Sequence, residues 1–314
     1  MPTNTLDSAL SAINSITKRK FIPKLADEVN TSNALLLYMG KNGGMDTVAG
    51  GTDIRQPLRY TRFTARGWYS GTETLDTSYN EKKFALIFPW AQYNVSITIS
   101  GLDDLKNAGE AKVIDHVKSE VEAAKEDVKD AFGTGLYSAG TDAKSIIGAR
   151  VFLSTSNTYG GVSQTANSWL QAKVDSTTTV LSLSAMQSRW EAAKEAPDAP
   201  NLITCTESIF NSFFSLLQPQ QRFTDGETAK AGFQNLLFNG APVLEDSYCP
   251  TSYMVFWNLK HLKMYSHSER NFPGKFMEFE KPINQDASVA HIYWAGQLVC
   301  EEPRKFAALS AITS

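Results

Sequence analysis

A charged amphipathic stretch at residues 103–132 limits what this chain can fold into more than any other feature. Its apolar positions recur in steps of four, four, three, four and four: Val113, Val117, Val121, Ala124, Val128 and Phe132. This spacing puts them on one face of a helix. About 30 residues at 1.5 Å per residue make a rod of roughly 45 Å. Asp103 and Asp104 can cap its start, and Gly133 and Gly135 can end it.

The apolar stripe of this helix is narrow and consists mostly of Val and Ala. Such a helix lies along the surface of a sheet or a core. A coiled coil is the alternative, but the run covers only about three heptads and lacks Leu at the seam. We therefore expect one long helix inside a domain, with its charged faces in water and strand-rich segments on both sides.

The segment 48–88, which precedes the helix, reads as a long β-hairpin with a poorly apolar tip. Ile54 and Leu58 alternate with polar residues, and the alternation resumes at Phe84, Leu86 and Phe88. A two-stranded hairpin of this length is marginal alone in water, so it needs another surface. We predict that a neighbouring subunit supplies it, and the alternative is a hairpin packed on its own domain. The candidate inter-subunit contacts are Arg59, Arg62, Arg66, Trp68 and Tyr69.

The rest of the chain mixes further strands and helices. We predict helices within residues 21–39, 182–196 and 207–218, and strands at 89–101, around Val151, and at 201–206, 233–238, 241–245 and 252–258. Ser182 or Ser184 would cap the helix at 182–196. Residues 259–276 look like an edge or a loop, and 288–313 contain two buried strands. Pro197 and Pro200 bracket the best candidate for a domain boundary.

The composition is that of an ordinary globular chain. The 314 residues are 42% hydrophobic and 20% charged, which is enough apolar surface for a core in one large domain or two. A net charge of −3 argues against a dedicated nucleic-acid binder, which would carry a basic excess. Residues 1–83 carry 11 Lys or Arg and 8 Asp or Glu, a local balance of +3, which leaves −6 for the remainder. This small asymmetry could attract one copy of the chain to another.

The cysteines and the apolar runs limit the cellular context. Cys205, Cys249 and Cys300 are far apart and odd in number, so we expect three buried, reduced thiols rather than a disulfide framework or a metal motif. The N-terminus lacks the architecture of a signal peptide, and no run approaches 18 apolar residues. We expect a soluble chain made in a cytoplasm, without a membrane partner.

A search of the sequence for catalytic signatures finds neither a GxSxG elbow nor an HExxH zinc motif. His261 and His267 do not share a helical face, and Lys263 between them would repel a cation. The acid pair Glu301 and Glu302 would point apart on a strand, which does not suit paired acid–base catalysis. We predict no catalytic residue, no metal and no cofactor.

Three short stretches in the second half of the chain carry a resemblance. They are Thr158–Val162 with Trp169, Phe238–Asp246, and Pro250–Leu259. Following an arm, a hairpin and a long helix, they resemble the major capsid proteins of tailed bacteriophages, the Hong Kong 97-like fold. The first looks like that family's Gly-Gly and Trp element, the second like its F-G-P-V-x-x-D strand, and the third like a strand ending in Asn, here Asn258. The resemblance covers roughly residues 20–314.

The resemblance implies an α+β fold in five parts. These are an N-terminal arm at 1–47, an extension loop (an extended β-hairpin) at 48–88, a peripheral domain at 84–198 with a long spine helix at 103–132, an axial domain at 199–292, and a return to the peripheral domain at 293–314. It also implies a non-enzymatic structural protein. Such a subunit self-assembles through hexamers and pentamers into the icosahedral shell of a tailed phage around double-stranded DNA.

The resemblance further implies a set of partners. They are other copies of the chain, a scaffolding protein, portal and decoration proteins, and packaged double-stranded DNA contacted without sequence specificity. The protein would be part of the virion, assembled in the host cytoplasm. The arm is short compared with relatives that begin with a long scaffolding-like segment, which favours a separate scaffold or none. Lys82 and Lys83 lie at the base of the hairpin and no Asn can be matched, so the covalent cross-link of some relatives is not expected.

Two alternatives stay open. The first shares the fold: an encapsulin, a bacterial nanocompartment shell that encloses a cargo enzyme. The second is a hydrolase or transferase with an unrecognised site, for which Cys205, Asp246 and His267 are the residues to test.

Overall fold

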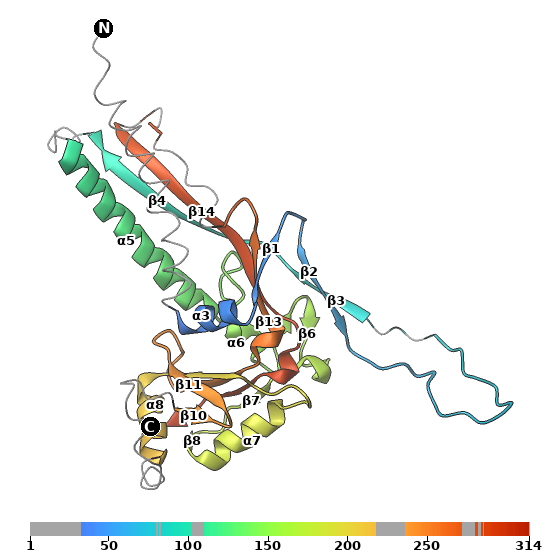
Figure 1. Ribbon diagram of the computed structural model, residues 1–314. Helices are drawn as coiled ribbons and strands as arrows, with labels where there is room; N and C mark the ends of the chain where they lie inside the picture. Colours follow the sequence, from blue (N-terminus) through green and yellow to red (C-terminus); the bar gives the residue numbers. More distant parts are fainter. Residues whose placement is uncertain are drawn as a thin grey trace.

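Two large sheets, a long helix and a projecting two-stranded hairpin are the main features of the fold (Figure 1). The computed structural model describes residues 33–79, 81, 83–101, 110–217, 236–271, 280, 281, 284 and 286–313, and only the backbone of residues 110–118. The helices are α3 (Ala34–Lys41), α5 (Glu110–Leu136), α6 (Ala149–Phe152), α7 (Leu183–Ala193) and α8 (Glu207–Leu217). Single 3-10 turns are η2 (Ser168–Leu170), η5 (Leu259–His261) and η6 (Pro303–Lys305).

Strands are distributed along the whole described chain, so the structure confirms a mixed helix and sheet fold. The strands before residue 200 are β1 (Met45–Val48), β2 (Ile54–Arg59), β3 (Lys83–Phe88), β4 (Ala91–Ser100), β5 (Thr158–Tyr159), β6 (Val162–Ser163), β7 (Lys173–Asp175) and β8 (Thr179–Val180). Those after it are β9 (Leu202–Cys205), β10 (Leu237–Phe238), β11 (Ala241–Glu245), β12 (Met254–Trp257), β13 (Leu262–His267), β14 (Ala287–Cys300), β15 (Ala307–Leu309) and β16 (Ile312–Thr313).

The long helix predicted at 103–132 is confirmed over its described part, as α5. Its predicted apolar stripe is buried where side chains are described, since Val121, Ala124, Val128 and Phe132 are at most 5% exposed. Residues 103–109 and the side chains of Val113 and Val117 lie outside the described residues. The helix packs on β4, and the Phe132 ring meets Trp294 of β14 edge to face at 4.7 Å. Within the chain, α5 therefore packs on a sheet, as predicted, and does not form a coiled coil with another described helix.

The predicted end of the helix at Gly133 is wrong, because α5 continues to Leu136. Gly133 serves close packing instead: a Cβ at this position would run into the ring of Tyr248. Glycine can adopt the helical conformation, although it stabilises a helix less than alanine does. The helix therefore continues through Gly133 while the missing side chain leaves room for the ring.

The first sheet contains four strands in the order β1-β13-β14-β4. The β14 and β4 strands pair antiparallel from Ala287↔Ser100 to Gly296↔Ala91, and β13 lies between β1 and β14. The prediction of an edge or loop at 259–276 is thus wrong for β13, which is an interior strand. Lys263 and His267 interrupt its apolar pattern, but they share the more open face of the strand while Leu262 and Met264 are buried.

The second sheet contains six strands in the order β10-β11-β9-β12-β15-β7. Both β9 and β12 are buried along their whole length, as expected for strands covered on two faces. Helix α7 packs on β15 and β7, and α8 packs on β11. Ser182 caps α7 by accepting a 3.2 Å hydrogen bond from the Ala185 N–H, as predicted. These elements confirm the predicted helices at 182–196 and 207–218.

The strand predicted around Val151 is wrong, because the chain forms the short helix α6 there. Gly148 begins the helix, and Ala149 and Phe152 are fully buried. The periodicity of a short apolar run fits a buried strand and a buried helical turn equally well. Periodicity alone therefore could not distinguish the two at Val151.

The sheets divide the chain at places different from the predicted segments. The predicted boundary between residues 292 and 293 falls inside β14, which pairs with β4 from Ala287 to Gly296. The chain returns to the six-stranded sheet only afterwards, where β15 pairs with β12 and β7. The β13 and β14 strands therefore share a sheet with β4, and β15, which follows them, shares a sheet with β9.

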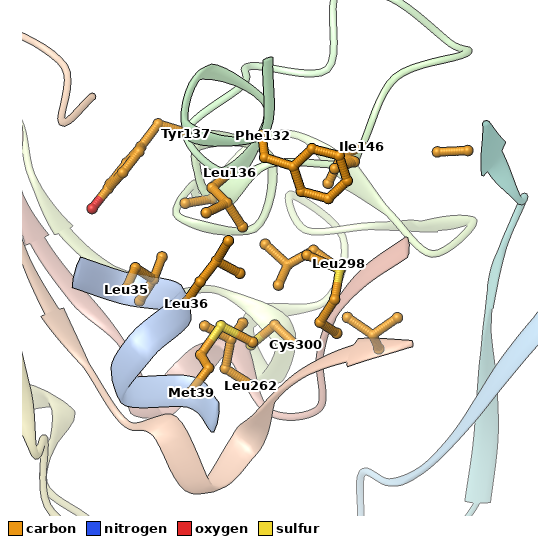
Figure 2. Packing of buried hydrophobic residues seen from close by; sticks show 14 of the residues in the cluster. Leu35, Leu36, Met39, Phe132, Leu136, Tyr137, Ile146, Leu262, Leu298 and Cys300 are labelled. Atoms are coloured by element: carbon orange, nitrogen blue, oxygen red, sulfur yellow. The ribbon is translucent and has the colours of Figure 1, made fainter. Parts of the chain in front are cut away.

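The main core lies where α3, the end of α5 and the four-stranded sheet meet (Figure 2). Leu35, Leu36 and Met39 of α3 point toward Leu136 of α5, and Leu262, Leu298 and Cys300 close the cluster from the sheet. Asn33 caps α3, since its side chain accepts hydrogen bonds from the N–H groups of the first turn. The described part of the helix predicted within 21–39 is thereby confirmed.

Candidate subunit interface

The loop between β2 and β3 extends away from the rest of the molecule (Figure 1). Nine large hydrophobic residues among those described are exposed, and seven of them lie between positions 63 and 87. They are Phe63, Trp68, Tyr69, Leu75, Tyr79, Phe84 and Ile87. Trp68 is fully exposed. Single exposed apolar residues are ordinary, but a concentration of them on one projecting segment marks an interaction site.

The base of the hairpin is rigidly held, in contrast to its tip. The β2 and β3 strands pair antiparallel from Ile54↔Phe88 to Arg59↔Lys83, which confirms the predicted hairpin. Ile54, Leu86 and Phe88 are buried in the main core. The pairing and burial of the base fix where the loop leaves the body of the molecule.

The Gly-Gly and Trp element forms the support of this base. The Ile87 N–H donates a 3.1 Å hydrogen bond to the Gly160 carbonyl, and a Cβ at Gly160 would run into Leu86. The Phe88 ring lies 5.0 Å from the ring of Tyr159. Sequence reasoning marked Gly160 and Trp169 as family-like positions but did not find that they hold the hairpin.

Trp169 supports β2 from the side. Its ring stacks on Tyr60 at a centroid distance of 5.4 Å, immediately beyond the last residue of β2. The Tyr60 hydroxyl in turn donates a 3.0 Å hydrogen bond to the Glu81 carbonyl on the returning chain. Stacked aromatic pairs of this kind contribute roughly 0.5–1.5 kcal/mol beyond the area they bury. The two arms of the loop are therefore joined where it leaves the body.

The five predicted contact residues all lie on the projecting segment, and all are exposed. Arg59 donates from Nε to the Thr61 carbonyl at 3.1 Å, and its guanidinium lies 5.2 Å from the centre of the Phe63 ring. Arg62 and Arg66 follow along the same arm, and Trp68 and Tyr69 occupy its outer part. Arginines interleaved with aromatic rings are typical of the buried centre of protein interfaces.

A surface of the opposite charge lies on α5. Between residues 119 and 136, where its side chains are described, the exposed ionisable residues are all acidic: Glu122, Glu126, Asp127 and Asp130. Burial and the nearby Asp127 and Asp130 carboxylates raise the pKa of Tyr93, which reports the negative potential at this end of the helix. We call these four residues the acidic face of α5.

A hollow of about 930 Å³ adjoins the acidic face of α5 at Asp130. Aromatic rings of Tyr93, Phe132, Tyr248 and Trp294 line it. A cleft with apolar walls and a charged rim has the composition of a site that receives side chains of a partner.

The residues proposed for a hydrolytic site do not form one. Cys205 is buried in β9, and burial raises its pKa to about 12, so that it is a poor nucleophile. His267 lies at the end of β13 in the other sheet, with its ring 5.6 Å from Trp90. Asp246 accepts a 2.8 Å hydrogen bond from the Tyr137 hydroxyl inside the core. The three predicted thiols, Cys249 and Cys300 included, are all buried and free, which confirms that prediction.

Within the described part of the chain, no group of three or more His, Cys, Asp or Glu side chains is placed to hold a metal ion. None of the helices in that part combines the length and apolar character that crossing a membrane requires.

Comparison with known structures identifies the class of fold. The structure is similar to the capsid asymmetric unit of cyanophage A-1(L), with a TM-score of 0.61 and 17% identity over 86% of this chain and 90% of that one. It is also similar to the capsid of a native GTA particle, with a TM-score of 0.64 and 12% identity over 88% and 90% of the two chains. No protein-family model and no curated protein matches the sequence.

The fold is therefore that of the major capsid proteins of tailed bacteriophages, as the resemblance implied. An encapsulin has a similar structure: the holo-SrpI complex from Synechococcus elongatus PCC 7942 matches with a TM-score of 0.52 and 9% identity, over 87% of each chain. These neighbours are shell proteins rather than enzymes.

Proposed function

We propose that this protein is the major capsid subunit of a tailed phage, and that copies of it assemble into an icosahedral shell around double-stranded DNA. The observation that carries the proposal is the capsid fold over 86% of the chain, combined with a rigidly based loop that exposes Trp68 and Tyr69 to solvent. A monomer would gain nothing from such a loop, whereas a shell needs contacts that reach from one subunit to the next.

The two sheets suggest how the chain divides into the domains of a capsid subunit. We assign the four-stranded sheet and α5 to the peripheral domain, with α5 as its spine, and the six-stranded sheet with α7 and α8 to the axial domain. The β13 and β14 strands then belong to the peripheral domain and β15 to the axial domain, because of the sheets they join. The β2–β3 hairpin is the extension loop. The predicted arm at 1–47 is shortened in this proposal to the part before α3, because α3 lies in the main core and β1 is an edge strand of the four-stranded sheet.

The principal contact in this proposal joins the loop of one subunit to α5 of the next. Arg59, Arg62 and Arg66 offer positive charge, and the acidic face of α5 offers negative charge. The adjoining hollow accepts the aromatic side chains of the loop. Charge complementarity of this kind directs the approach and register of subunits more than it adds affinity.

The proposed partners follow from the shell. They are other copies of the chain in hexamers and pentamers, a scaffolding protein, portal and decoration proteins, and packaged DNA contacted without sequence specificity. With a net charge of −3, the chain suits a wall that touches DNA non-specifically rather than one that binds it tightly. The protein would be a virion component assembled in the host cytoplasm.

An encapsulin-like nanocompartment is the second candidate, because the encapsulin structure also matches over 87% of this chain. The content of the particles separates the two functions. Particles should be purified after nuclease treatment from cells that express the natural gene neighbourhood. Protected double-stranded DNA supports the capsid, and a co-purifying enzyme in DNA-free particles supports the nanocompartment.

Sedimentation velocity tests the shared claim of assembly. The proposal predicts a fast-sedimenting population, hundreds of subunits in size, or discrete rings of five or six subunits. A chain that sediments as a monomer at high concentration, with and without the other virion proteins, would contradict it.

A further inference from the structure

The chain crosses between the two sheets at two places that lie against each other. Residues 258–261 lead from β12 to β13, and residues 301–306 lead from β14 to β15. The Glu301 N–H donates a 2.8 Å hydrogen bond to the His261 carbonyl and so joins the two crossings. Both segments join strands of the two sheets directly, so a change in the angle between the sheets would alter their geometry.

A compact group of ionisable side chains surrounds the crossings, and we call it the crossing cluster. It consists of Asp198, Lys260, His261, Lys263, Glu301, Glu302 and Lys305. Asp198 precedes β9 of the six-stranded sheet, whereas Glu301 follows β14 of the four-stranded sheet. The side chains of His261 and Lys305 are only 16% and 10% exposed, so water screens their interactions weakly.

His261 occupies a position that one protonation state cannot satisfy. Its Nε2 lies 3.1 Å from Asp198 Oδ2 and 2.9 Å from Lys305 Nζ. A carboxylate only accepts hydrogen bonds, and an ammonium group only donates them. Nε2 can therefore donate to Asp198 when it carries a proton, or accept from Lys305 when it does not, but it cannot do both.

The two patterns tie the sheets together to different degrees. Doubly protonated His261 donates from Nε2 to Asp198 and faces Glu301 Oε2 with Nδ1–H at 3.6 Å, so that one cation bridges carboxylates from both sheets. Lys305 then keeps Asp198 and Glu302, at 2.9 and 3.1 Å. Neutral His261 gives up one of these two bridges, and Asp198, Glu301 and Glu302 retain fewer positive charges around them.

We propose that protonation of His261 closes a clamp between the two sheets, so that pH sets how firmly their relative orientation is held. The groups that face His261 are Asp198, Glu301, Glu302 and Lys305 from other segments, and Lys260 and Lys263 from its own. The clamp belongs to the single chain and does not rest on shell assembly.

The direction of the pH dependence follows from the carboxylates. The Glu301 carboxylate, and after it Asp198, raise the pKa of His261 above its usual value, against the opposing effect of burial and Lys305. A group whose pKa is raised by folding stabilises the fold fully below its unfolded pKa of about 6.5. That stabilisation is lost as the pH rises through the higher pKa of the folded protein. The clamp is thus closed in mild acid and opens toward alkaline pH.

A second feature makes the crossing responsive. Asn258, the first residue of the β12–β13 crossing, is fully buried, and neither polar atom of its side chain has a hydrogen-bond partner among the described residues. An unpartnered buried amide destabilises the arrangement that holds it. The β12–β13 crossing is therefore less stable than the strands on either side. Its conformation then depends more strongly on the ion pairs and hydrogen bonds of the crossing cluster.

Hydrogen exchange measured by mass spectrometry on the full chain tests the clamp. We expect the protection of the amides at 259–262 and 301–306, corrected for intrinsic exchange rates, to fall several-fold between pH 6.0 and pH 8.5. Protection in β4 and β14 should stay unchanged over the same range. Equal protection of the crossings at both pH values in the natural protein would overturn the proposal without any variant.

Two variants assign the effect. His261→Gln cannot gain the proton, so we expect its crossings to exchange at the alkaline rate at both pH values. His267→Gln is the matched control, because His267 ends β13, the strand that follows His261, and lies outside the crossing cluster; its Nδ1 accepts a hydrogen bond from the Glu269 N–H. If His261→Gln fails to fold, Asp198→Asn removes one bridge and should reduce the pH dependence. A pH response that persists in these variants would assign it to another group and overturn the proposal.

Discussion

The hydroxyl of Tyr137, the residue that follows the end of α5, donates a 2.8 Å hydrogen bond to Asp246 Oδ2. The same hydroxyl lies 3.1 Å from Thr204 Oγ1, which accepts a 2.7 Å hydrogen bond from Trp257 Nε1. Thr204 and Trp257 lie on β9 and β12, so this buried network fastens the end of α5 to the six-stranded sheet. The middle of α5 packs on β4 of the other sheet.

Removing this hydroxyl should weaken the connection between helix and sheet. Tyr137→Phe leaves Asp246 with a single partner, the Tyr248 N–H at 3.0 Å, and leaves a buried carboxylate oxygen without its donor. We expect the free energy of unfolding to fall by about 1–3 kcal/mol, measured by urea denaturation. Tyr93→Phe is the matched control, since the Tyr93 hydroxyl makes only a 3.5 Å contact, with the Asp127 carbonyl. Equal losses in the two variants would contradict this account of the network.

The two adjacent glycines at the hairpin base make an internal comparison. Gly160 and Gly161 both have positive φ, +55° and +83°, so alanine at either position carries backbone strain of roughly 1–2 kcal/mol. Only at Gly160 would the new Cβ also meet Leu86. We expect Gly160→Ala to lower the free energy of unfolding by about 1–3 kcal/mol more than Gly161→Ala. Similar losses would show that Gly160 does not support β3.

Deleting residues 62–80 should separate folding from assembly. The tip makes no contribution to the buried core, whereas Ile54, Leu86 and Phe88 at the base do. We expect a folded subunit with a cooperative thermal transition that forms fragile shells or none. Circular dichroism and electron microscopy measure the two outcomes. An unfolded subunit would instead show that the loop belongs to the fold.

A charge exchange tests the proposed contact between the loop and the acidic face of α5. Arg66→Glu should raise the concentration at which particles form several-fold, because each exposed ion pair contributes about 0.2–1 kcal/mol and recurs in every subunit. Combining it with Asp127→Lys should restore part of the assembly, and light scattering follows both. Lys194→Glu, just beyond α7, is the control, since Lys194 is exposed and lies outside the loop. An unchanged threshold in Arg66→Glu would place the contact elsewhere.

Salt should act on the same contact. Exposed charges separated by more than about 8 Å are largely screened at physiological ionic strength, and more strongly screened above it. We expect the association rate of subunits to fall as sodium chloride increases, and Arg66→Glu to lose most of this dependence. An association rate independent of salt would indicate that apolar contacts of Trp68 and Tyr69 dominate the approach.

The sequence predicted the regular, strongly patterned elements and missed those whose signal is mixed. The stripe from Val121 to Phe132 predicted α5, and alternation predicted the β2–β3 hairpin. Two predictions from periodicity were wrong. Lys263 and His267 interrupt the apolar pattern of the interior strand β13, and the four residues of α6 fit a helix and a strand equally well. Local periodicity carries no information on which distant strand is a neighbour, so the β14–β4 pairing required the structure.

In the candidate interface too, some features could be predicted from the sequence and others required the structure. Composition identified Arg59, Arg62, Arg66, Trp68 and Tyr69 as suited to a contact, because exposed-type aromatics and arginines there had no apolar surface of their own to cover. The support from Tyr159, Gly160 and Trp169 depends on contacts about 70 to 110 residues apart in sequence, such as the Tyr60–Trp169 stack, which no short pattern contains. The crossing cluster likewise gathers Asp198, His261 and Lys305 from distant segments.

Electron microscopy of the purified full-length protein, alone and with its accessory virion proteins, tests the central claim most directly. The account predicts closed icosahedral shells, or rings of five or six subunits, in which density for the β2–β3 loop of one subunit lies across α5 of the next. Dispersed single subunits under every condition, or assemblies in which the loop projects into solvent, would contradict it.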